Sequence, residues 1–259
     1  MKPLSPGREL VPGVRVSAHL HRSRHLDVYA AACERRGCPV VVKTVRPDRL
    51  SRADVARDLL REGRLLRRLT HPHIARGYDV HREPRPAIVL ETIGGETLAH
   101  LLDRRDLPAR EVAELGRQLA SALGYLHAEG YVHLDLKPSN VVADAGRAKL
   151  LDLSIAQRPG PIRAGRGTWC NMAPEQAAGG RVTAAADVWG LGTVLWEAAT
   201  GVNPFDEIDQ LRERAESVRS LRPRLPRPLA EAIDGCLEPR PADRPALAEL
   251  REGLAACAG

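Results

Sequence analysis

The chain contains 259 residues, of which 43% are hydrophobic, so it can bury a sizeable core as one large domain or as two lobes. Its 39 Lys and Arg residues outnumber 33 Asp and Glu, which gives a formal net charge of +6. The arginines are spread along the chain with few aromatic residues between them. This pattern favours a solvated surface over a nucleic-acid site, while a specific anionic partner stays open.

The sequence lacks the segments that are typical of membrane or secreted proteins. No apolar run approaches the roughly 18 residues that a membrane span needs, and the best candidate, 188–200, contains Glu197. The first residues carry no apolar signal-peptide core. We therefore expect a soluble, cytoplasmic protein with no membrane span. Its five cysteines are expected to be reduced thiols, with Cys33 and Cys38 facing each other across a hairpin turn.

The predicted elements begin with a β-rich region. Pro and Gly punctuate residues 1–12, which are expected to be loose. Strands are predicted at 14–16, 28–31 and 40–43, the last of them ending at Lys43.

A helix and two short strands follow. Apolar residues at helical spacing predict a helix over 51–70, with Ser51 as its N-cap. Strands are expected at 75–80 and 87–91. The Thr-Ile-Gly-Gly sequence at 92–95 then breaks the pattern, and we interpret it as a hinge.

The remaining sequence is mainly helical. Helices are predicted over 97–104, 109–129 and 184–200, and the last of these is so apolar that it should be buried. Short strands are predicted at 141–142 and 148–151.

The most informative segment is 131–140, Tyr-Val-His-Leu-Asp-Leu-Lys-Pro-Ser-Asn, which is followed by Asp152. It places an acid, a lysine and an asparagine in one loop, with a second acid after a short hairpin. Phosphoryl transfer requires a base, charge neutralisation at the γ-phosphate and oxygen ligands for Mg²⁺. The segment resembles the catalytic loop and metal-binding motif of the eukaryotic-like (Hanks-type) protein kinases, including bacterial serine/threonine kinases.

This resemblance covers about residues 10–254 and implies the fold. We expect the α+β, bilobal protein kinase fold, with a small β-rich N-lobe and a larger, mainly helical C-lobe. Residues 1–259 would form a single kinase domain, with the N-lobe at about 10–91, the hinge at 92–95 and the C-lobe at 96–259.

The resemblance also implies catalytic roles. Asp135 would act as the base that orients the acceptor hydroxyl, and Lys137 would reach the γ-phosphate. Lys43 would neutralise the α- and β-phosphates and pair with Glu62. The chain has few lysines besides Lys43 and Lys137. Lysine at these two positions therefore indicates sites where the planar guanidinium of arginine cannot replace a compact ammonium.

The implied cofactors are ATP and Mg²⁺, with Mn²⁺ as a substitute metal. Asn140 and Asp152 would be the metal ligands, because hard cations prefer oxygen. The full set of residues implied for cofactor binding is Lys43, Glu62, Val28, Val41, Glu91, Ile93, Asn140 and Asp152.

A second segment, 167–176, resembles the peptide-docking segment of the family. The family pattern pairs Glu175 with Arg244, and bidentate geometry would suit a buried clamp. Asp187 resembles the acid that holds the backbone of the catalytic loop. A docking segment implies a protein substrate and argues against kinases of small molecules.

The chain departs from the family at the glycine-rich loop. His21, Ser23 and Leu26 stand where three glycines would let backbone N–H groups approach phosphates. Either this loop no longer holds ATP in the usual way, or Arg22, Arg24 and the histidines replace backbone amides with side-chain charge. If contacts are merely lost, restoring the three glycines should improve nucleotide affinity; an unchanged or weaker affinity would indicate an adapted clamp.

Other departures concern packing around the nucleotide and the metal. Val41 stands where the family prefers alanine, Leu153 and Ser154 replace a Phe-Gly pair, and Gly77 falls where an apolar residue usually supports the Glu62 helix.

One departure concerns regulation. Leu134 replaces the arginine that pairs with a phosphate on the activation segment. Between Asp152 and Glu175 the only hydroxyls are on Ser154 and Thr168, both at motif positions. We therefore hypothesise that phosphorylation of this segment does not switch activity.

The favoured interpretation is a serine/threonine protein kinase that transfers the γ-phosphate of Mg·ATP to a protein hydroxyl. The alternative is a pseudokinase that acts as a binding or scaffolding module, and a kinase of small molecules is a third class. The expected partners are a protein substrate and a regulatory protein on the Glu62 helix, with no nucleic acid.

Overall fold

The computed structural model describes residues 2–205 and 214–258. The chain divides into two compact units. Unit 1 comprises Met1–Thr70, Ile74–Gly94 and Asp152–Ser154, and unit 2 comprises His71–His73, Gly95–Leu151 and Ile155–Gly259. One unit is built on a sheet and the other mainly on helices, so the α+β class is confirmed. The hinge role of residues 92–95 stays a prediction.

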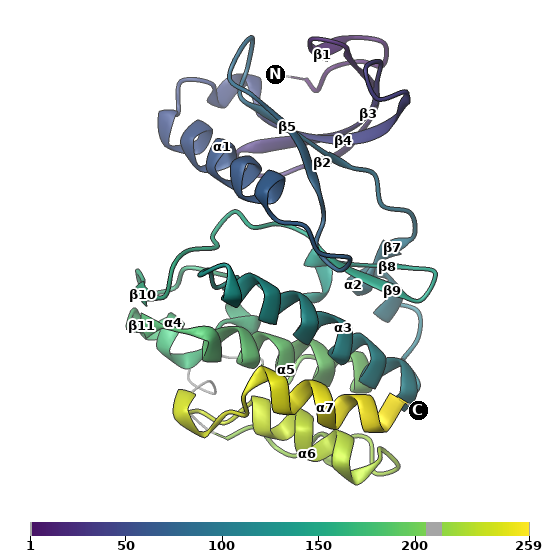
Figure 1. The fold of residues 1–259 in the computed structure, drawn as a ribbon, viewed down its shortest axis with the longest axis vertical. Helices are drawn as coiled ribbons and strands as arrows, with labels where there is room; N and C mark the ends of the chain where they lie inside the picture. The colour runs from purple at the N-terminus through teal and green to yellow at the C-terminus, as the bar shows by residue number, and fades with distance from the viewer. Residues whose placement is uncertain (1, 206–213, 259) are drawn as a thin grey trace. The chain divides into compact units, whose positions relative to one another are not determined.

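Unit 1 contains a six-stranded antiparallel sheet in the order β1-β2-β3-β4-β6-β5, with one long helix beside it (Figure 1). The elements are β1 (Glu9–Val11), β2 (Val14–Arg22), β3 (Leu26–Cys33), β4 (Cys38–Val45), the short 3₁₀ helix η1 (Pro47–Arg49), α1 (Ala53–Arg68), β5 (Gly77–His81) and β6 (Ala87–Glu91).

The N-terminal segment is not loose throughout, so that prediction was wrong for residues 9–11. They form β1, where Leu10 and Val11 are each only 1% exposed. These two apolar side chains join a buried cluster with Tyr29 on the sheet, and the Tyr29 hydroxyl accepts a hydrogen bond from the Leu4 N–H. Burial of apolar area outweighs the effect of the flanking Pro and Gly.

The predicted strands form: β2, β3 and β4 are longer than predicted, β6 has the predicted bounds, and β5 covers Gly77–His81 where 75–80 was predicted. The hairpin between β3 and β4 places Cys33 opposite Cys38, as expected, and both are free cysteines. Because side chains alternate along a strand, β4 presents two different faces. Val40 and Val42 are fully buried on one face, whereas Val41 on the other is half-buried.

Helix α1 begins at Ala53, so Ser51 as its N-cap was wrong. The N-cap position belongs to Arg52, whose guanidinium binds Asp54 in the first turn, because η1 and its following turn displace the helix start. The helix packs closely on the sheet through two glycines. A Cβ on Gly63 would lie 2.3 Å from the Ile88 side chain, and a Cβ on Gly77 would lie 2.8 Å from the α1 backbone. Gly77, which stands in β5 where an apolar residue was expected, therefore permits the close approach of α1 to the sheet.

Unit 2 is mainly helical, and α3, α5, α6 and α7 stack in it (Figure 1). Its helices are α2 (Leu98–Leu102), α3 (Ala109–Ala128), α4 (Pro174–Ala178), α5 (Ala184–Thr200), α6 (Arg227–Cys236) and α7 (Leu247–Ala258), with 3₁₀ turns η2 (Pro138–Asn140), η3 (Trp169–Asn171), η5 (Val218–Ser220) and η6 (Pro241–Asp243). Its strands are β7 (Glu96–Thr97), β8 (Val141–Asp144) and β9 (Arg147–Leu150) in one sheet, and β10 (Gly160–Pro161) with β11 (Arg181–Val182) in another.

The core of unit 2 confirms the apolar-helix prediction. Helix α5 has the predicted bounds, Thr183 caps its N-terminus, and Trp189 within it is fully buried and stacks on Phe205. Helix α2 is shorter than predicted at both ends: Thr97 is its N-cap and accepts a hydrogen bond from the His100 N–H, and Asp103 is its C-cap. Of the helices in the described ranges, none is both long enough and apolar enough to cross a membrane.

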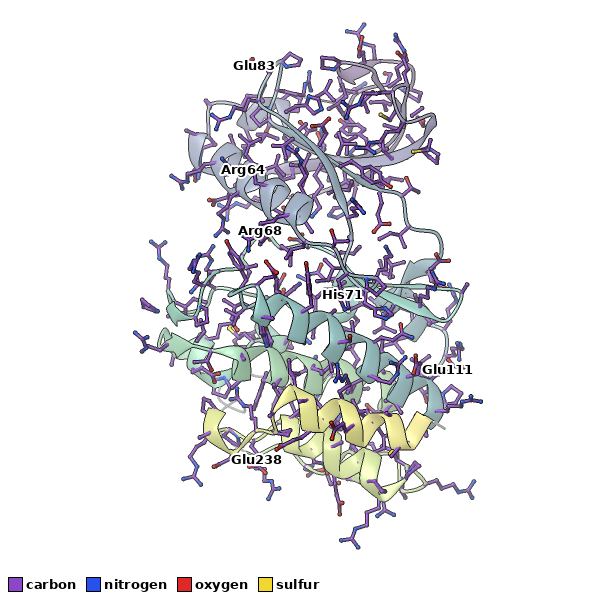
Figure 2. All side chains as sticks on the ribbon, viewed as in Figure 1. Arg64, Arg68, His71, Glu83, Glu111 and Glu238 are labelled. Carbon is purple, nitrogen blue, oxygen red and sulfur yellow. The ribbon has the colours of Figure 1, made fainter. Side chains whose placement is uncertain are left out.

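The His71-Pro72-His73 sequence has a structural role in unit 2. The His71 ring stacks on Tyr125 with centroids 5.2 Å apart, and His71 is labelled in Figure 2. His73 Nδ1 lies 2.8 Å from the Ala148 carbonyl oxygen. These contacts fix the segment against α3 and β9.

The two helical glycines Gly63 and Gly124 should respond oppositely to substitution by alanine. Gly63→Ala should destabilise the protein by about 1–3 kcal/mol, because the new methyl group collides with Ile88. Gly124→Ala in α3 meets no atom within 4 Å, so it should stabilise by about 0.5–1 kcal/mol through helix propensity. Urea unfolding of both variants measures this, and equal shifts of the same sign would contradict the packing described.

Candidate active site

One ammonium and two carboxylates from distant parts of the sequence meet in unit 1. Lys43 Nζ on β4 donates to Glu62 Oε1 on α1 at 2.8 Å and to Asp152 Oδ2 at 3.1 Å. The Lys43 and Glu62 side chains are 14% and 1% exposed, while Asp152 is 31% exposed. The predicted pairing of Lys43 with Glu62 is present, and Asp152 joins it.

The charges in this cluster stabilise one another. Burial opposes the charged form of Lys43, but Glu62 and Asp152 outweigh burial and raise the Lys43 pKa. Burial likewise opposes ionisation of Asp152, yet Lys43 and the Ser154 N–H bring the Asp152 pKa well below its usual range. Burial raises the Glu62 pKa, and Lys43 opposes that effect. The ammonium therefore favours the ionised form of both carboxylates, and at Asp152 its effect helps to outweigh that of burial.

The same face of the sheet carries the predicted nucleotide contacts. Val28 lies opposite Lys43 in the β3–β4 register, and Val41 is two residues from Lys43, so the three side chains share a face. Glu91 and Ile93 are half-buried at and beyond the end of β6, and Glu91 Oε1 accepts a hydrogen bond from the Arg76 N–H.

The residues after Asp152 are held in place despite replacing Phe-Gly. Leu153 is 1% exposed and packs in the core. The Ser154 N–H donates to Asp152 Oδ1 at 2.9 Å, and the Ser154 carbonyl accepts from Arg61 at 2.7 Å. Asp152 itself has φ +26°, an unusual value that these contacts stabilise.

In unit 2, the predicted catalytic residues gather around one hydroxyl. Thr168 Oγ1 donates to Asp135 Oδ1 at 2.6 Å and accepts from Lys137 Nζ at 2.5 Å. Lys137 Nζ also lies 3.0 Å from Asp135 Oδ2, and Asn140 Nδ2 donates to that same oxygen at 3.1 Å. The arrangement presents a carboxylate to a hydroxyl beside an ammonium.

The backbone of this loop is fixed by Asp187, as predicted. Its side chain is fully buried and accepts hydrogen bonds from the N–H groups of His133 and Leu134, each at 2.8 Å. His127 Nε2 lies 2.7 Å from the same carboxylate. Leu134 has φ +69°, which is costly for a residue with a branched side chain, so the buried carboxylate holds a strained loop.

The clamp predicted between Glu175 and Arg244 is present and bidentate. Arg244 Nη1 and Nη2 donate to Glu175 Oε1 and Oε2, both at 2.9 Å. The guanidinium also donates to the carbonyl oxygens of Ala185, Glu238 and Pro239. Its side chain is 0% exposed, so this charge is buried with its donors saturated.

Sequence reasoning missed Gln176. Its buried amide donates to the carbonyl oxygen of Leu134 at 2.7 Å and also to that of Arg166, which links the catalytic loop to the activation segment. The signal in the sequence was weak, because a glutamine beside a predicted clamp residue has no distinctive spacing.

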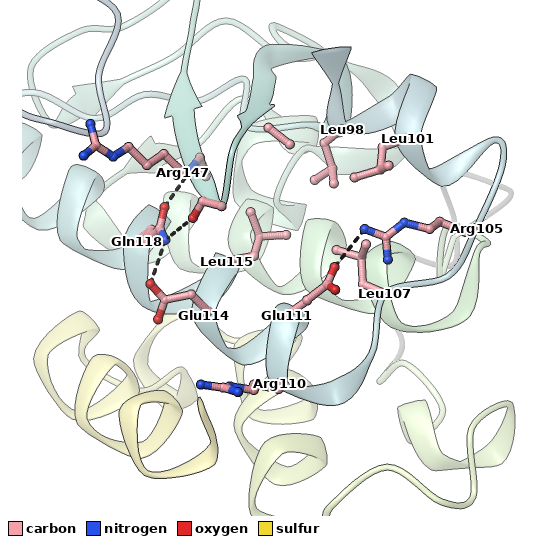
Figure 3. Close-up of a pocket in the computed structure, with 13 residues that line it drawn as sticks. Leu98, Leu101, Arg105, Leu107, Arg110, Glu111, Glu114, Leu115, Gln118 and Arg147 are labelled. Atoms are coloured by element: carbon pink, nitrogen blue, oxygen red, sulfur yellow. Dashed lines mark hydrogen bonds and ion pairs between the residues drawn. The ribbon is translucent and has the colours of Figure 1, made fainter. Parts of the chain in front are cut away.

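Unit 2 also contains a pocket of about 500 Å³ between α2, α3 and the β8–β9 hairpin. Figure 3 shows leucines lining it, among them Leu98 and Leu115, with a charged pair, Arg105 and Glu111, beside them at 3.0 Å. None of the predicted site residues is among its lining residues. It is therefore separate from the site built around Asp135.

The comparisons with known proteins agree with this geometry. A family model described as the protein kinase domain matches residues 25–253, and the chain belongs to this family. It is 36% identical to the serine/threonine-protein kinase PkaA of Streptomyces coelicolor over 240 residues, which cover 87% of this chain and 44% of PkaA. It is 34% identical to the serine/threonine-protein kinase PknD of Mycobacterium tuberculosis over 235 residues, which cover 84% of this chain and 35% of PknD.

A solved structure also matches over its whole length. A mutant form of the Mycobacterium tuberculosis PknI kinase domain has a TM-score of 0.79 and 26% identity, with 100% of both chains covered. The match confirms the protein kinase fold. The chain spans less than half the length of PkaA and PknD.

Loss of the buried Arg244–Glu175 ion pair should lower the free energy of unfolding far more than loss of the exposed Arg240–Asp243 pair. Arg244→Met should destabilise by about 3–5 kcal/mol, because it leaves the Glu175 charge without its partner. The control is Arg240→Met, since Arg240 is 85% exposed and pairs with Asp243 at 2.8 Å; its cost should stay within about 1 kcal/mol. Chemical unfolding measures both, and similar costs for the two variants would contradict the assigned role.

Proposed function

We propose that this chain is a serine/threonine protein kinase domain spanning residues 1–259, which transfers the γ-phosphate of Mg·ATP to a protein hydroxyl. The observation that carries the proposal is the Thr168 hydroxyl, held 2.6 Å from the Asp135 carboxylate and 2.5 Å from the Lys137 ammonium. An acceptor hydroxyl of a substrate needs these same two neighbours. The names of the relatives support the serine/threonine class.

The catalytic step would depend on positioning and electrostatics more than on covalent chemistry. Asp135 would orient the acceptor hydroxyl and accept its proton as the acceptor oxygen bonds to the γ-phosphorus and the bond from that phosphorus to the β-phosphate oxygen breaks, releasing ADP. Lys137 would neutralise charge that develops on the transferring phosphoryl group. Asp187 would keep the loop that bears both residues in its strained conformation.

In unit 1, Lys43 would contact the nucleotide phosphates while Glu62 fixes its direction. Val28, Val41, Glu91 and Ile93 would form the nucleotide pocket, with the two methyl groups of Val41 narrowing the adenine slot.

The donor set fits a divalent cation that prefers oxygen ligands. Asp152 is ionised and partly exposed, beside a cluster in which two carboxylates share one ammonium. Asn140 would supply a neutral oxygen. Two protein ligands suit Mg²⁺, which keeps several waters and phosphate oxygens in its shell, and Mn²⁺ would substitute. When bound, the metal neutralises negative charge on the phosphates.

We propose that phosphorylation of the activation segment does not control the activity. In place of an arginine–phosphate pair, Gln176 joins the carbonyl oxygens of Leu134 and Arg166 through neutral hydrogen bonds. Val132 and Gln157 also exchange backbone hydrogen bonds at 2.8 and 3.1 Å. These contacts would order the segment without a phosphate. A regulatory protein that binds α1 and a cytoplasmic location complete the proposal.

One observation favours the pseudokinase alternative. The turn that replaces the glycine-rich loop is closed by its own hydrogen bonds, so it does not offer the usual row of free backbone amides. A binding module with this feature would retain the fold but show no turnover.

Lys43→Met and Asp152→Asn should each lower phosphate transfer by roughly 10²-fold or more, because each removes a charge that acts on the phosphates. Both variants should stay folded; in Lys43→Met the buried Glu62 can take up a proton, because burial already raises its pKa. The control is Lys149→Met, the same chemical change outside the site. Labelled phosphate transfer and circular dichroism measure the outcome, and full activity in either site variant would contradict the assignment.

Phosphatase treatment of the purified protein should leave its activity unchanged, because neutral hydrogen bonds order the activation segment. The measurement is the initial rate before and after treatment, with mass spectrometry of the segment that contains Thr168. Phosphate on Thr168 whose removal lowered the rate would contradict the proposal.

A further inference from the structure

The turn between β2 and β3 is closed by a serine hydroxyl. Strand β2 ends at Arg22 and β3 begins at Leu26, which leaves residues 23–25 as the turn. Ser23 Oγ accepts hydrogen bonds from the N–H groups of His25 at 3.4 Å and Leu26 at 3.0 Å, and the Ser23 N–H donates to the Leu26 carbonyl at 2.9 Å. Most backbone donors of the turn are thereby committed inside the turn itself.

The carbonyl oxygens of the turn are committed as well. Arg46, just after β4, donates from Nη1 to the carbonyl oxygens of Ser23 at 3.1 Å and Arg24 at 3.3 Å. Its backbone N–H donates to the His25 carbonyl at 3.0 Å. The turn is therefore fixed to the segment that leads into η1.

Arg22 already has a carboxylate partner, which argues against the alternative in which it contacts phosphate. Its guanidinium donates to both carboxylate oxygens of Asp27, at 2.7 and 2.9 Å. The Asp27 side chain is fully buried and also contacts His19 Nε2 at 3.1 Å. The bidentate ion pair between Arg22 and Asp27 therefore joins the two strands at the base of the turn and holds the turn closed.

Three side chains around the turn carry nitrogen donors that make no hydrogen bond within the described residues. Arg24 is exposed, and its guanidinium makes no hydrogen bond or ion pair there. His25 Nδ1 and Arg49 Nε are buried atoms without a hydrogen-bond partner in the described chain, although Arg49 Nε lies 3.6 Å from Asp48 Oδ2 in an ion pair. Buried polar atoms without partners are rare in native proteins, and an absent ion is one explanation for them.

The cations gather around His25. Burial lowers the His25 pKa, and Arg24, Arg52 and Arg49 lower it further, against a smaller opposing effect of Asp54. The nearby carboxylates already have partners, since Asp54 binds Arg52, and Asp48 is shared by Arg46, which donates two hydrogen bonds to it, and Arg49 at 3.6 Å. The uncompensated charge is therefore positive, and an anion would relieve it.

We propose that the β2–β3 turn and η1 form a phosphate-binding site in which Arg24, His25 and Arg49 replace the backbone amides of a glycine-rich loop. Ser23 is a positioning residue that keeps the turn closed. The phosphate group comes from a nucleotide or from a phosphorylated protein side chain. Binding of a nucleotide phosphate at this site rests on the proposed kinase function. Binding of a phosphorylated protein side chain does not.

The test is calorimetric titration of the whole chain at low ionic strength. The variants are Arg24→Ala, Arg49→Ala and their double variant. Arg35→Ala is the matched control, because it removes the same charge at the opposite end of β3 and is 73% exposed. The ligands are ATP, ADP, adenosine, inorganic phosphate, and a phosphoserine peptide beside its unphosphorylated twin.

Each lost charged contact should weaken phosphate binding roughly tenfold or more. If the arginine variants bind ATP and ADP more weakly than the wild type does but bind adenosine equally well, the phosphate comes from a nucleotide. A loss confined to the phosphopeptide identifies a phosphorylated protein. Both results support the site, and Arg35→Ala should bind every ligand as the wild type does.

Two results overturn the site: no binding of any phosphate ligand by the wild type, or unchanged affinities in the double variant. These outcomes are separate from failure of the proposed function. A chain that transfers no phosphate but binds it through Arg24 keeps the site and loses the kinase proposal. Normal phosphate transfer, together with unchanged phosphate affinities in the double variant, keeps the kinase proposal and overturns the phosphate-binding site.

The role of Ser23 has its own readout. Ser23→Gly opens the turn and should weaken phosphate binding and speed amide exchange at residues 24–26, whereas Ser23→Thr keeps a hydroxyl and should restore both. Stronger binding by Ser23→Gly, with or without glycines at 21 and 26, would show that free amides are the better ligands and overturn the positioning role.

Discussion

The sharing of one ammonium by two carboxylates is the interaction on which the organisation of unit 1 depends. Lys43 comes from β4, Glu62 from α1 and Asp152 from a segment about 60 residues beyond the end of the sheet. Burying any one of these charges alone would be costly. The cluster is tolerable only when strand, helix and segment come together, so the electrostatics of three residues constrain the packing of the whole unit.

The same requirement recurs in unit 2, where each buried charge is saturated by several partners. Asp187 accepts from two backbone amides, and Arg244 donates to a carboxylate and three carbonyl oxygens. These two residues fix the strained loop and the segment around Glu175, and the loop holds Asp135 and Lys137 beside the Thr168 hydroxyl.

The sequence predicted features whose cause is local or whose motif spacing is distinctive. The apolar run of α5 and its cap, and the pairs Lys43–Glu62 and Glu175–Arg244, were of this kind. The failures have a shared physical origin in tertiary contacts that override local signals. Residues 9–11 form a strand because they cover Tyr29, and α1 starts late because η1 precedes it. Arg22 binds Asp27, a pairing that no spacing rule in the sequence indicates.

The most direct measurement for the central claim is transfer of labelled γ-phosphate from Mg·ATP by the wild type beside Asp135→Asn, with the protein itself and a generic basic protein as acceptors. Asparagine keeps the shape of the side chain but cannot accept the hydroxyl proton. The account predicts label with the wild type and none with the variant. Absence of label from both, repeated with Mn²⁺ and with GTP, would contradict a catalytic role and favour the binding-module alternative.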